Sequence, residues 1–270
     1  MSRISAVTSR ASKEGKKLLI PYLVAGDPNI ATTLSLMHEL VAAGADIIEL
    51  GVPFSDPSAD GPVIQRGVER ALARGTTLEA TLEVVRLFRQ KDAETPVVLM
   101  GYLNPIEIMG YQKFTQHAVA VGIDGVLVVD MPPAESAILH QMLQQAAIDT
   151  IYLVAPTTSP DRAAAIAEHS TGYLYYVSLK GVTGAALTDH ASVSGNIKAL
   201  RELTDLPIVI GFGIKDGDSA RAMASLAEGV VIGSALVDKI RDLTEPEQIS
   251  PDQLFATTEV IREVRKAINS

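Results

Sequence analysis

One carboxylate of the sequence lies in a run of apolar residues, where a charge is costly. Glu49 follows Ile47 and Ile48 and precedes Leu50. Burial raises the pKa of a carboxyl group because desolvation disfavours the anion, and a pKa near neutrality suits general acid catalysis. The alternative is a structural carboxylate that a buried arginine or backbone amides neutralise. Glu49 is therefore the first candidate for a catalytic residue.

Two aspartates follow in the loop after the same predicted strand. Asp56 and Asp60 lie in a stretch rich in proline and glycine that ends at Pro62, and this composition restricts the conformations of the loop. Carboxylates that follow one strand can converge with Glu49 on one substrate as an acid and base pair. Each aspartate can equally be a turn-capping residue, a common role for aspartate in such loops.

Three turns rich in glycine supply a second signal. They contain Gly184, Gly213, and Gly233 with Ser234, and each turn follows a predicted strand. Backbone amides of such turns, together with a helix N-terminus, often form a phosphate site in α/β barrels. Asp216 stands where a dinucleotide-binding fingerprint would need its third glycine. The turns therefore favour a phosphorylated small molecule, although each turn alone is also typical of an ordinary connection.

Short apolar blocks that alternate with helical patterns must position these residues. We predict eight strands, at Leu18–Val24, Asp46–Leu50, Val97–Tyr102, Gly125–Asp130, Thr150–Ala155, Tyr173–Ser178, Pro207–Gly211 and Gly229–Gly233. Continuous apolar runs suit parallel strands that are covered on both faces. Eight strand and helix alternations predict an α/β fold, a single (β/α)8 TIM barrel over residues 1–270, with the active site at the carboxyl ends of its strands. A doubly wound open sheet would give the same alternation.

The interval between the second and third predicted strands is the longest and holds two helical patterns, so the barrel has extra helices in its loops. The second pattern is Leu78–Gln90, and Thr76 with Glu79 is typical of a capping box at its start. On the predicted sixth strand, Tyr173 and Tyr175 alternate with an apolar residue and are expected to fill the barrel, although one of them could line the mouth of the pocket.

The composition excludes several kinds of site and partner. The chain has 270 residues, no cysteine and a formal net charge of −9. Without cysteine there is no disulfide, no cysteine-ligated metal and no thiol nucleophile. The histidines form no cluster with metal-ligand spacing, so we expect no metal. The acidic balance disfavours nucleic acid, which needs a basic face, but it leaves open an anionic substrate held by backbone amides.

The hydropathy pattern gives no targeting or membrane signal. The first 17 residues are polar and lack the apolar core of a signal peptide. No apolar run approaches the roughly 20 residues of a membrane helix. We therefore expect a cytoplasmic protein that does not associate with membranes.

Residues 49–62, with the sequence ELGVPFSDPSADGP, resemble the signature of the tryptophan synthase α subunit family. Further similar segments follow the family's order along nearly the whole chain: Pro21–Asp27, Tyr102–Pro105, Asp130–Pro133, Gly181–Gly184, Gly211–Ile214 and Gly233–Ser234. The resemblance implies a TIM barrel with an additional N-terminal helix. It also implies a lyase that cleaves indole-3-glycerol phosphate to indole and glyceraldehyde 3-phosphate by a retro-aldol reaction.

The resemblance also implies roles for individual residues. Glu49 matches the family's acid and base, and Asp60 matches its partner for the indole N–H. The implied phosphate contacts are Gly184, Gly213, Gly233 and Ser234. The implied pocket positions are Tyr22, Tyr175, Thr183 and Phe212. The implied lid and partner-interface residues are Pro53, Asp56, Asn104, Asp130 and Pro132.

The family resemblance implies a partner as well. The chain would work with a tryptophan synthase β subunit in an α2β2 heterotetramer, and the β subunit, rather than this chain, would carry pyridoxal phosphate. Two alternatives stay open. One is a stand-alone indole-glycerol-phosphate lyase, and the other is a non-catalytic module that binds phosphosugars.

Overall fold

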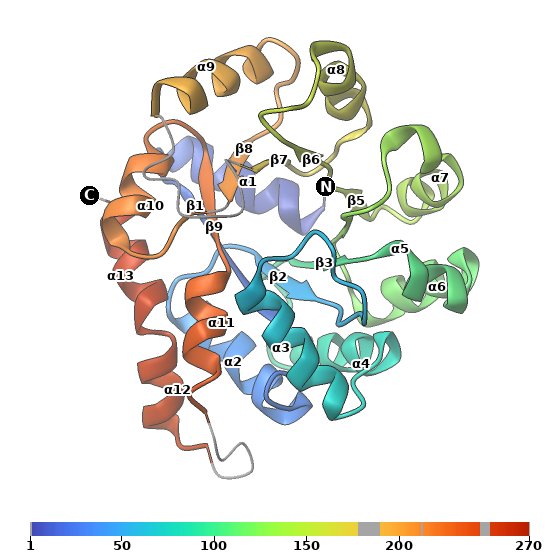
Figure 1. The fold of residues 1–270 in the computed structure, drawn as a ribbon, viewed down its shortest axis with the longest axis vertical. Helices are drawn as coiled ribbons and strands as arrows, with labels where there is room; N and C mark the ends of the chain where they lie inside the picture. The colour runs from blue at the N-terminus through green and yellow to red at the C-terminus, as the bar shows by residue number, and fades with distance from the viewer. Residues whose placement is uncertain (1, 178–189, 212, 244–248, 270) are drawn as a thin grey trace.

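The computed structural model describes residues 2–177, 190–211, 213–243 and 249–269. Its strands are β1 (Leu18–Val24), β2 (Ile48–Gly51), β3 (Val97–Gly101), β4 (Gly125–Val128), β5 (Asp149–Thr150), β6 (Leu153–Val154), β7 (Leu174–Val177), β8 (Ile208–Gly211) and β9 (Gly229–Ile232). They pair in the order β5-β4-β3-β2-β1-β9-β8-β7-β6 (Figure 1). Every pairing is parallel.

The strands at the two ends of this order, β5 and β6, follow each other in the chain and form one extended segment. The segment bonds to both neighbours, because Ile151 donates its N–H to Val126 O and Tyr175 donates its N–H to Tyr152 O. The sheet therefore closes, and β5 with β6 makes up the fifth of the eight predicted strands. The TIM barrel prediction is confirmed, and the open-sheet alternative is wrong.

The strands are buried on both faces, as their apolar runs predict. All seven residues of β1 are buried. Leu19 and Leu23 join the apolar layer between the strands and the outer helices, while Ile20 and Val24 belong to the cluster inside the barrel. This alternation follows from the period of two along a strand. It makes the barrel a packed core that opens only at its ends.

The outer layer consists of helices. They are α1 (Arg3–Glu14), α2 (Ile30–Ala42), α3 (Pro62–Ala73), α4 (Leu78–Phe88), α5 (Leu103–Met109), α6 (Tyr111–Val121), η1 (Pro133–Glu135), α7 (Ala137–Gln145), α8 (Pro160–His169), α9 (His190–Arg201), α10 (Gly217–Ala224), α11 (Ser234–Ile240), α12 (Pro251–Thr257) and α13 (Glu259–Ile268). The additional N-terminal helix and the extra helices in the loops are thus present.

Helix α1 covers the end of the barrel where the strands begin. Ile4, Val7 and Ala11 are buried in the cluster inside the barrel. Arg3 and Arg89, the C-cap residue of α4, both pair with Asp124, which is almost fully buried just before β4. These contacts fasten α1 to the barrel and leave the opposite end free for a site.

The structure corrects the predicted start of α4. Its N-cap is Thr77, which has an extended backbone and whose hydroxyl accepts a hydrogen bond from the N–H of Ala80. Thr76 is instead buried against Gly26, where its side chain fills the space that a Cβ at position 26 would need. The capping box of Thr76 with Glu79 is therefore wrong, because tertiary packing takes the Thr76 side chain.

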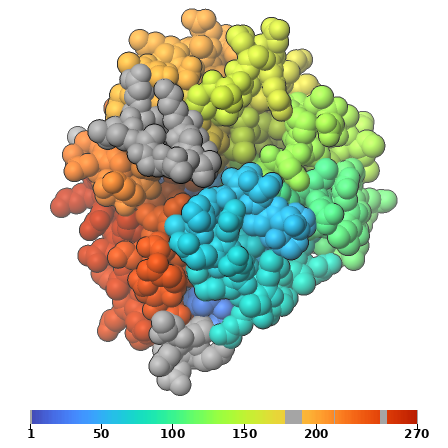
Figure 2. All heavy atoms as spheres, in the orientation of Figure 1, coloured from blue at the N-terminus to red at the C-terminus, as the bar shows by residue number. Residues whose placement is uncertain are grey.

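Helices α3 and α11 begin at the carboxyl ends of β2 and β9. The two helices contact each other and both contact β1. They lie in front of the strands in Figure 1, and in Figure 2 the cyan surface of the segment with α3 meets the orange surface of α11 near the middle of this face. The loops that precede these two helices hold several of the predicted site residues.

Candidate active site

Glu49 is held inside the barrel with one carboxylate oxygen occupied and the other free. The residue lies on β2 and is 0% exposed. The hydroxyl of Tyr173 donates a hydrogen bond to Oε1 at 2.6 Å. Oε2 is buried and has no hydrogen-bond partner among the described residues. No arginine or backbone amide among the described residues neutralises this oxygen. A purely structural role for Glu49 would need such a partner, so the structure disfavours that alternative.

Burial raises the pKa of Glu49 to about 7, and the hydrogen bond from Tyr173 opposes this rise because it favours the anion. At neutral pH the side chain therefore has a comparable share of acid and carboxylate forms. A group in this condition can both give and take a proton. The sequence context predicted the direction of this shift, and the structure supplies its cause.

Asp60 lies in the loop between β2 and α3 and is half-buried. The hydroxyl of Tyr102 donates a hydrogen bond to its Oδ2 at 3.0 Å and accepts one from the N–H of Ala59 at 3.0 Å. Burial raises the pKa of Asp60, and the bond from Tyr102 opposes the rise. Tyr102 comes from the end of β3, so two strand ends together position this carboxylate.

A cavity of about 440 Å³ opens at this end of the barrel. Seven of the predicted site residues line it, namely Glu49, Asp60, Tyr22, Tyr175, Gly213, Gly233 and Ser234. The apolar part of the lining includes Met100 of β3, Ile64 of α3 and Val231 of β9. A cavity with apolar walls and a few convergent polar groups is typical of a small-molecule site.

The glycine turns lie at one side of the cavity. Gly213 has a φ of +79°, a conformation that residues with a Cβ rarely adopt. Gly233 and Ser234 begin α11. The first amides of a helix have no carbonyl within that helix to bind, so they can donate to an anion. A Cβ on Gly233 would lie 3.3 Å from the Tyr22 ring, which leaves little room for any other residue.

Three predicted site residues cannot be placed. Thr183, Gly184 and Phe212 lie outside the described residues. Nothing in the structure therefore bears on their predicted roles.

The residues of the predicted partner face lie outside the cavity lining. Asp56 and Asn104 are exposed, Pro53 is buried, Asp130 is exposed and Pro132 is half-buried. Asp130 accepts the N–H of Leu103 at 2.8 Å, so the segment after β4 is tied to the start of α5. None of the five lines the cavity with Glu49.

Several residues of the site were not predicted from the sequence. Tyr173 was expected to fill the barrel, with one of Tyr173 and Tyr175 as a possible residue of the pocket mouth. Its hydrogen bond to the candidate acid was not predicted. Met100 and Val231 gave no signal apart from their place on apolar strands. Lys215 and Asp238 also line the cavity. The glycines of the turn after β8 marked this segment as part of a possible site, but they gave no reason to single out Lys215.

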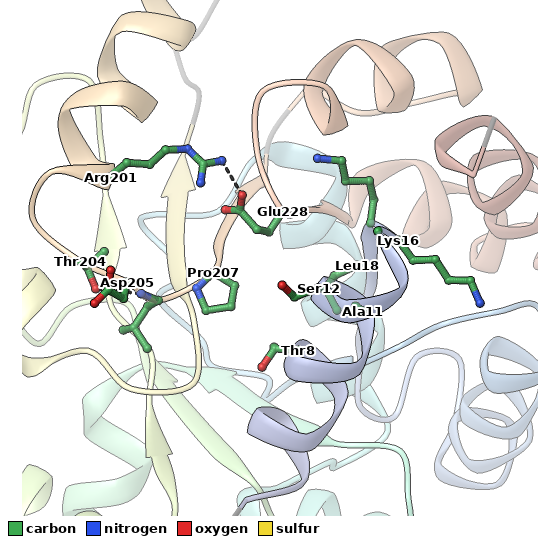
Figure 3. A pocket seen from close by; sticks show the side chains of 13 residues that line it. Thr8, Ala11, Ser12, Lys16, Leu18, Arg201, Thr204, Asp205, Pro207 and Glu228 are labelled. Carbon is green, nitrogen blue, oxygen red and sulfur yellow. Dashed lines mark hydrogen bonds and ion pairs between the residues drawn. The ribbon is translucent and has the colours of Figure 1, made fainter.

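A second cavity of about 460 Å³ lies at the opposite end of the barrel (Figure 3). Thr8 and Ser12 of α1 and Pro207, just before β8, contribute to its walls. Arg201 reaches across to Glu228, and these two side chains form an ion pair. The active sites of TIM barrels form at the other end, where Glu49 and Asp60 lie. We therefore do not regard this cavity as the active site.

The comparisons with known proteins agree with this geometry. The family model described as "Tryptophan synthase alpha chain" matches residues 8–268. The chain belongs to the tryptophan synthase alpha chain family. Members of this family are lyases of tryptophan biosynthesis, so the chain is an enzyme subunit of that class.

Individual relatives in the tryptophan synthase alpha chain family are similar over their whole length. The alpha chain of Marinobacter nauticus is 50% identical over 271 residues, covering 100% of this chain and 99% of the relative. The alpha chain of Laribacter hongkongensis is 54% identical over 267 residues, covering 99% of this chain and 100% of the relative. The crystal structure of tryptophan synthase subunit alpha from Legionella pneumophila superposes with a TM-score of 0.91 at 43% identity, covering 100% of this chain and 99% of that chain.

Two further properties of the described residues bear on the kind of protein. Within the described ranges, every helix is too short or too polar to cross a membrane. In the same ranges, no three acidic or histidine side chains are arranged to hold a metal ion.

Proposed function

We propose that this chain cleaves indole-3-glycerol phosphate to indole and glyceraldehyde 3-phosphate. The observation that carries the proposal is the Glu49 carboxyl group, buried at the base of the cavity with a pKa of about 7 and with Oε2 unbonded among the described residues. Asp60 lines the same cavity, and family membership makes a lyase reaction the natural use of the pair.

The chemistry needs an acid before it needs a base. Indole leaves poorly as a carbanion, so C3 of the ring must be protonated before the bond to the glycerol chain breaks. Protonated Glu49 gives this proton, and the ring nitrogen becomes positively charged. Asp60, as a carboxylate, stabilises that charge through the ring N–H.

The second step uses the same glutamate in its other form. The glycerol hydroxyl next to the breaking bond loses its proton to the Glu49 carboxylate and becomes the aldehyde of glyceraldehyde 3-phosphate. The electrons of the broken carbon–carbon bond return to the indole ring and neutralise it. Glu49 ends protonated, as it began, which is the behaviour expected of a group that titrates near neutrality.

We propose that backbone amides hold the substrate's phosphate. Gly213, Gly233 and Ser234 line the cavity, and α11 begins at this wall, where its first amides have no carbonyl partner within the helix. Gly184 joins them by resemblance to the family. Tyr22 and Tyr175 would then line the apolar part that takes the indole ring.

We also propose a tryptophan synthase β subunit as the partner, in an α2β2 heterotetramer that works in the cytoplasm. The support is the family and the exposed position of Asp56, Asn104 and Asp130, which follow the carboxyl ends of β2, β3 and β4. Ile108 of α5 is 80% exposed beside this face, which suits an apolar contact. Pyridoxal phosphate belongs to the β subunit in this proposal, and this chain needs no cofactor.

An assay of indole release on the purified chain, with and without a β subunit, tests the proposal. We expect slow release by the chain alone and a marked increase with the partner. Glu49→Gln should abolish release in both cases with its thermal melting retained, because the amide cannot transfer the proton. Full activity of this variant would contradict the assignment of Glu49.

The same assay separates the alternatives. A stand-alone lyase would be equally active without the β subunit. A phosphosugar-binding module would bind the substrate and release no indole under either condition. The presence of a free acid oxygen in the cavity favours the lyase, because a binding module has no use for it.

A further inference from the structure

Acidic side chains outnumber basic ones in the lining of the cavity. Glu49, Asp60 and Asp238 are acidic, and Lys215 is the only lysine or arginine among the described lining residues. The chain as a whole carries a formal charge of −9. A phosphate that enters this cavity therefore meets a mostly acidic wall, and the long-range field of the protein opposes it.

All three acidic groups are partly offset. Burial disfavours the anions of Glu49 and Asp60. Asp238 of α11 pairs at 2.8 Å with Arg241, the C-cap residue of that helix. Asp60 stays as the carboxylate that the proposed reaction needs near the indole ring. The cavity thus has little free positive charge except at Lys215.

Lys215 is held at the side of the cavity where the glycine turns lie. It follows Gly213 by two residues, and its N–H donates to the hydroxyl of Ser219 at 3.1 Å. Asp216, the next residue, is the N-cap of α10, and its carboxylate accepts from the N–H of Ser219. The backbone at Lys215 is therefore fixed by the start of α10.

The side chain of Lys215 is available for a ligand. The residue is exposed, and its ammonium forms no ion pair with another described residue. The neighbouring Asp216 carboxylate is committed to capping α10. A lysine is a compact charge on a flexible stem, which suits a phosphate that backbone amides already orient.

We propose that the Lys215 ammonium binds the phosphate of the substrate and makes the enzyme selective for phosphorylated over unphosphorylated substrates. This inference rests on the proposed function. The amides of the glycine turns orient the phosphate, and Lys215 supplies the net positive charge that neutral amides lack. Lys215 acts on binding alone, so it lowers KM and leaves the proton transfers at Glu49 unchanged.

Three variants in the complex with the β subunit test this. Lys215→Gln removes the charge, Lys215→Arg keeps it, and Lys239→Gln removes an equal charge from an exposed lysine on α11 outside the cavity lining. We expect Lys215→Gln to raise KM for indole-3-glycerol phosphate by about three- to tenfold, with kcat little changed, as for a partly exposed charge-assisted contact. Lys215→Arg and Lys239→Gln should resemble the unaltered enzyme.

A binding measurement keeps this inference separate from the proposed reaction. Titration of the chain with glycerol 3-phosphate needs no turnover, and its affinity should fall for Lys215→Gln and weaken less steeply with added salt. Equal phosphate affinity and KM in Lys215→Gln and Lys239→Gln would overturn the inference, and so would an equal loss in Lys215→Arg. Absence of indole release from the unaltered complex would overturn the proposed function instead.

Discussion

At the scale of single residues, the character of Glu49 comes from the side chains around it. An apolar strand buries the carboxyl group, and the hydroxyl of Tyr173 holds Oε1 while Oε2 stays free. The burial is local and could be predicted from the neighbours of Glu49 in the chain. The hydrogen bond is not local, because Tyr173 is 124 residues away and nothing in its own segment indicates a carboxylate partner.

Replacing Tyr173 with phenylalanine tests the role of this hydrogen bond. The bond favours the carboxylate form of Glu49, so its loss should raise the pKa of Glu49 above about 7. Because the first proposed step needs the protonated acid, indole release should fall as the pH rises through this pKa. In Tyr173→Phe that fall should move to higher pH, and kcat at neutral pH should drop by about tenfold because Oε1 loses its anchor.

The measurement is the pH dependence of kcat in the α/β complex. Tyr176→Phe is the matched control, because Tyr176 lies on β7, which follows Tyr173 directly, faces the outer layer and bonds to Asn196. An unchanged pH profile in Tyr173→Phe would remove Tyr173 from the site.

At the scale of elements, the cavity depends on close approach between neighbouring strands. Tyr22 on β1 pairs in register with Glu49 on β2, and its ring lies over Gly51. A Cβ at position 51 would come within 2.3 Å of the Tyr22 hydroxyl oxygen. Because Gly51 has no Cβ, the Tyr22 side chain can lie against the end of β2 and line the cavity.

Gly51→Ala should displace the Tyr22 ring and disturb the wall of the cavity. We expect the free energy of unfolding to fall by about 1–3 kcal/mol, as for other overpacked cores, and indole release to fall strongly. Urea unfolding and the indole assay measure the two effects.

The comparison variant for Gly51→Ala is Gly195→Ala on α9. A Cβ there meets nothing within 4 Å, and the position is helical. Alanine should therefore stabilise the protein by about 0.5–1 kcal/mol without affecting activity. A Gly51→Ala variant that behaves like Gly195→Ala would show that Tyr22 can move without cost.

At the scale of the whole molecule, the two ends of the barrel do different work. The end with Glu49 and Asp60 carries the cavity with the candidate acid, while at the other end α1 packs against the barrel and a set of ion pairs holds the segments that precede the strands. Arg89 pairs with the buried Asp124 at 2.6 Å and also donates to the carbonyl oxygen atoms of Gly122 and Thr95. These contacts join α4 to the segments that precede β3 and β4.

Replacing Arg89 with methionine should leave Asp124 buried with fewer partners. We expect the free energy of unfolding to fall by about 3 kcal/mol, as when one member of a buried ion pair is removed. The kcat for indole release should stay the same below the melting temperature, because this pair lies at the end of the barrel opposite the site.

Arg86→Met, in the last turn of α4, is the control for Arg89→Met at the C-cap of that helix. Arg86 pairs with Glu83 on the exposed face, and such pairs contribute about 0.5 kcal/mol or less. Urea unfolding of both variants measures the difference. Equal stability losses would show that the Asp124 cluster adds nothing beyond an ordinary surface pair.

The sequence by itself determined the architecture and most of the site. All eight strands lie within two residues of their predicted positions, because continuous apolar runs bounded by helical patterns have few other ways to be buried. Glu49, Asp60 and the turns at Gly213 and Gly233 stood at strand ends, and parallel strands bring such ends together. The single domain over residues 1–270 and the roles of all the predicted site residues, Glu49 and Asp60 included, stay predictions.

Only the tertiary structure decided which side chains meet. Tyr173 with Glu49 and Tyr102 with Asp60 are pairs between distant segments, and Thr76 left its predicted cap because it packs against Gly26. The charge balance of the cavity, with Lys215 as the one described cation in its lining, also appears only in three dimensions. The physical reason is that periodicity and capping depend on near neighbours, whereas hydrogen bonds and fields depend on how the closed barrel brings distant residues together.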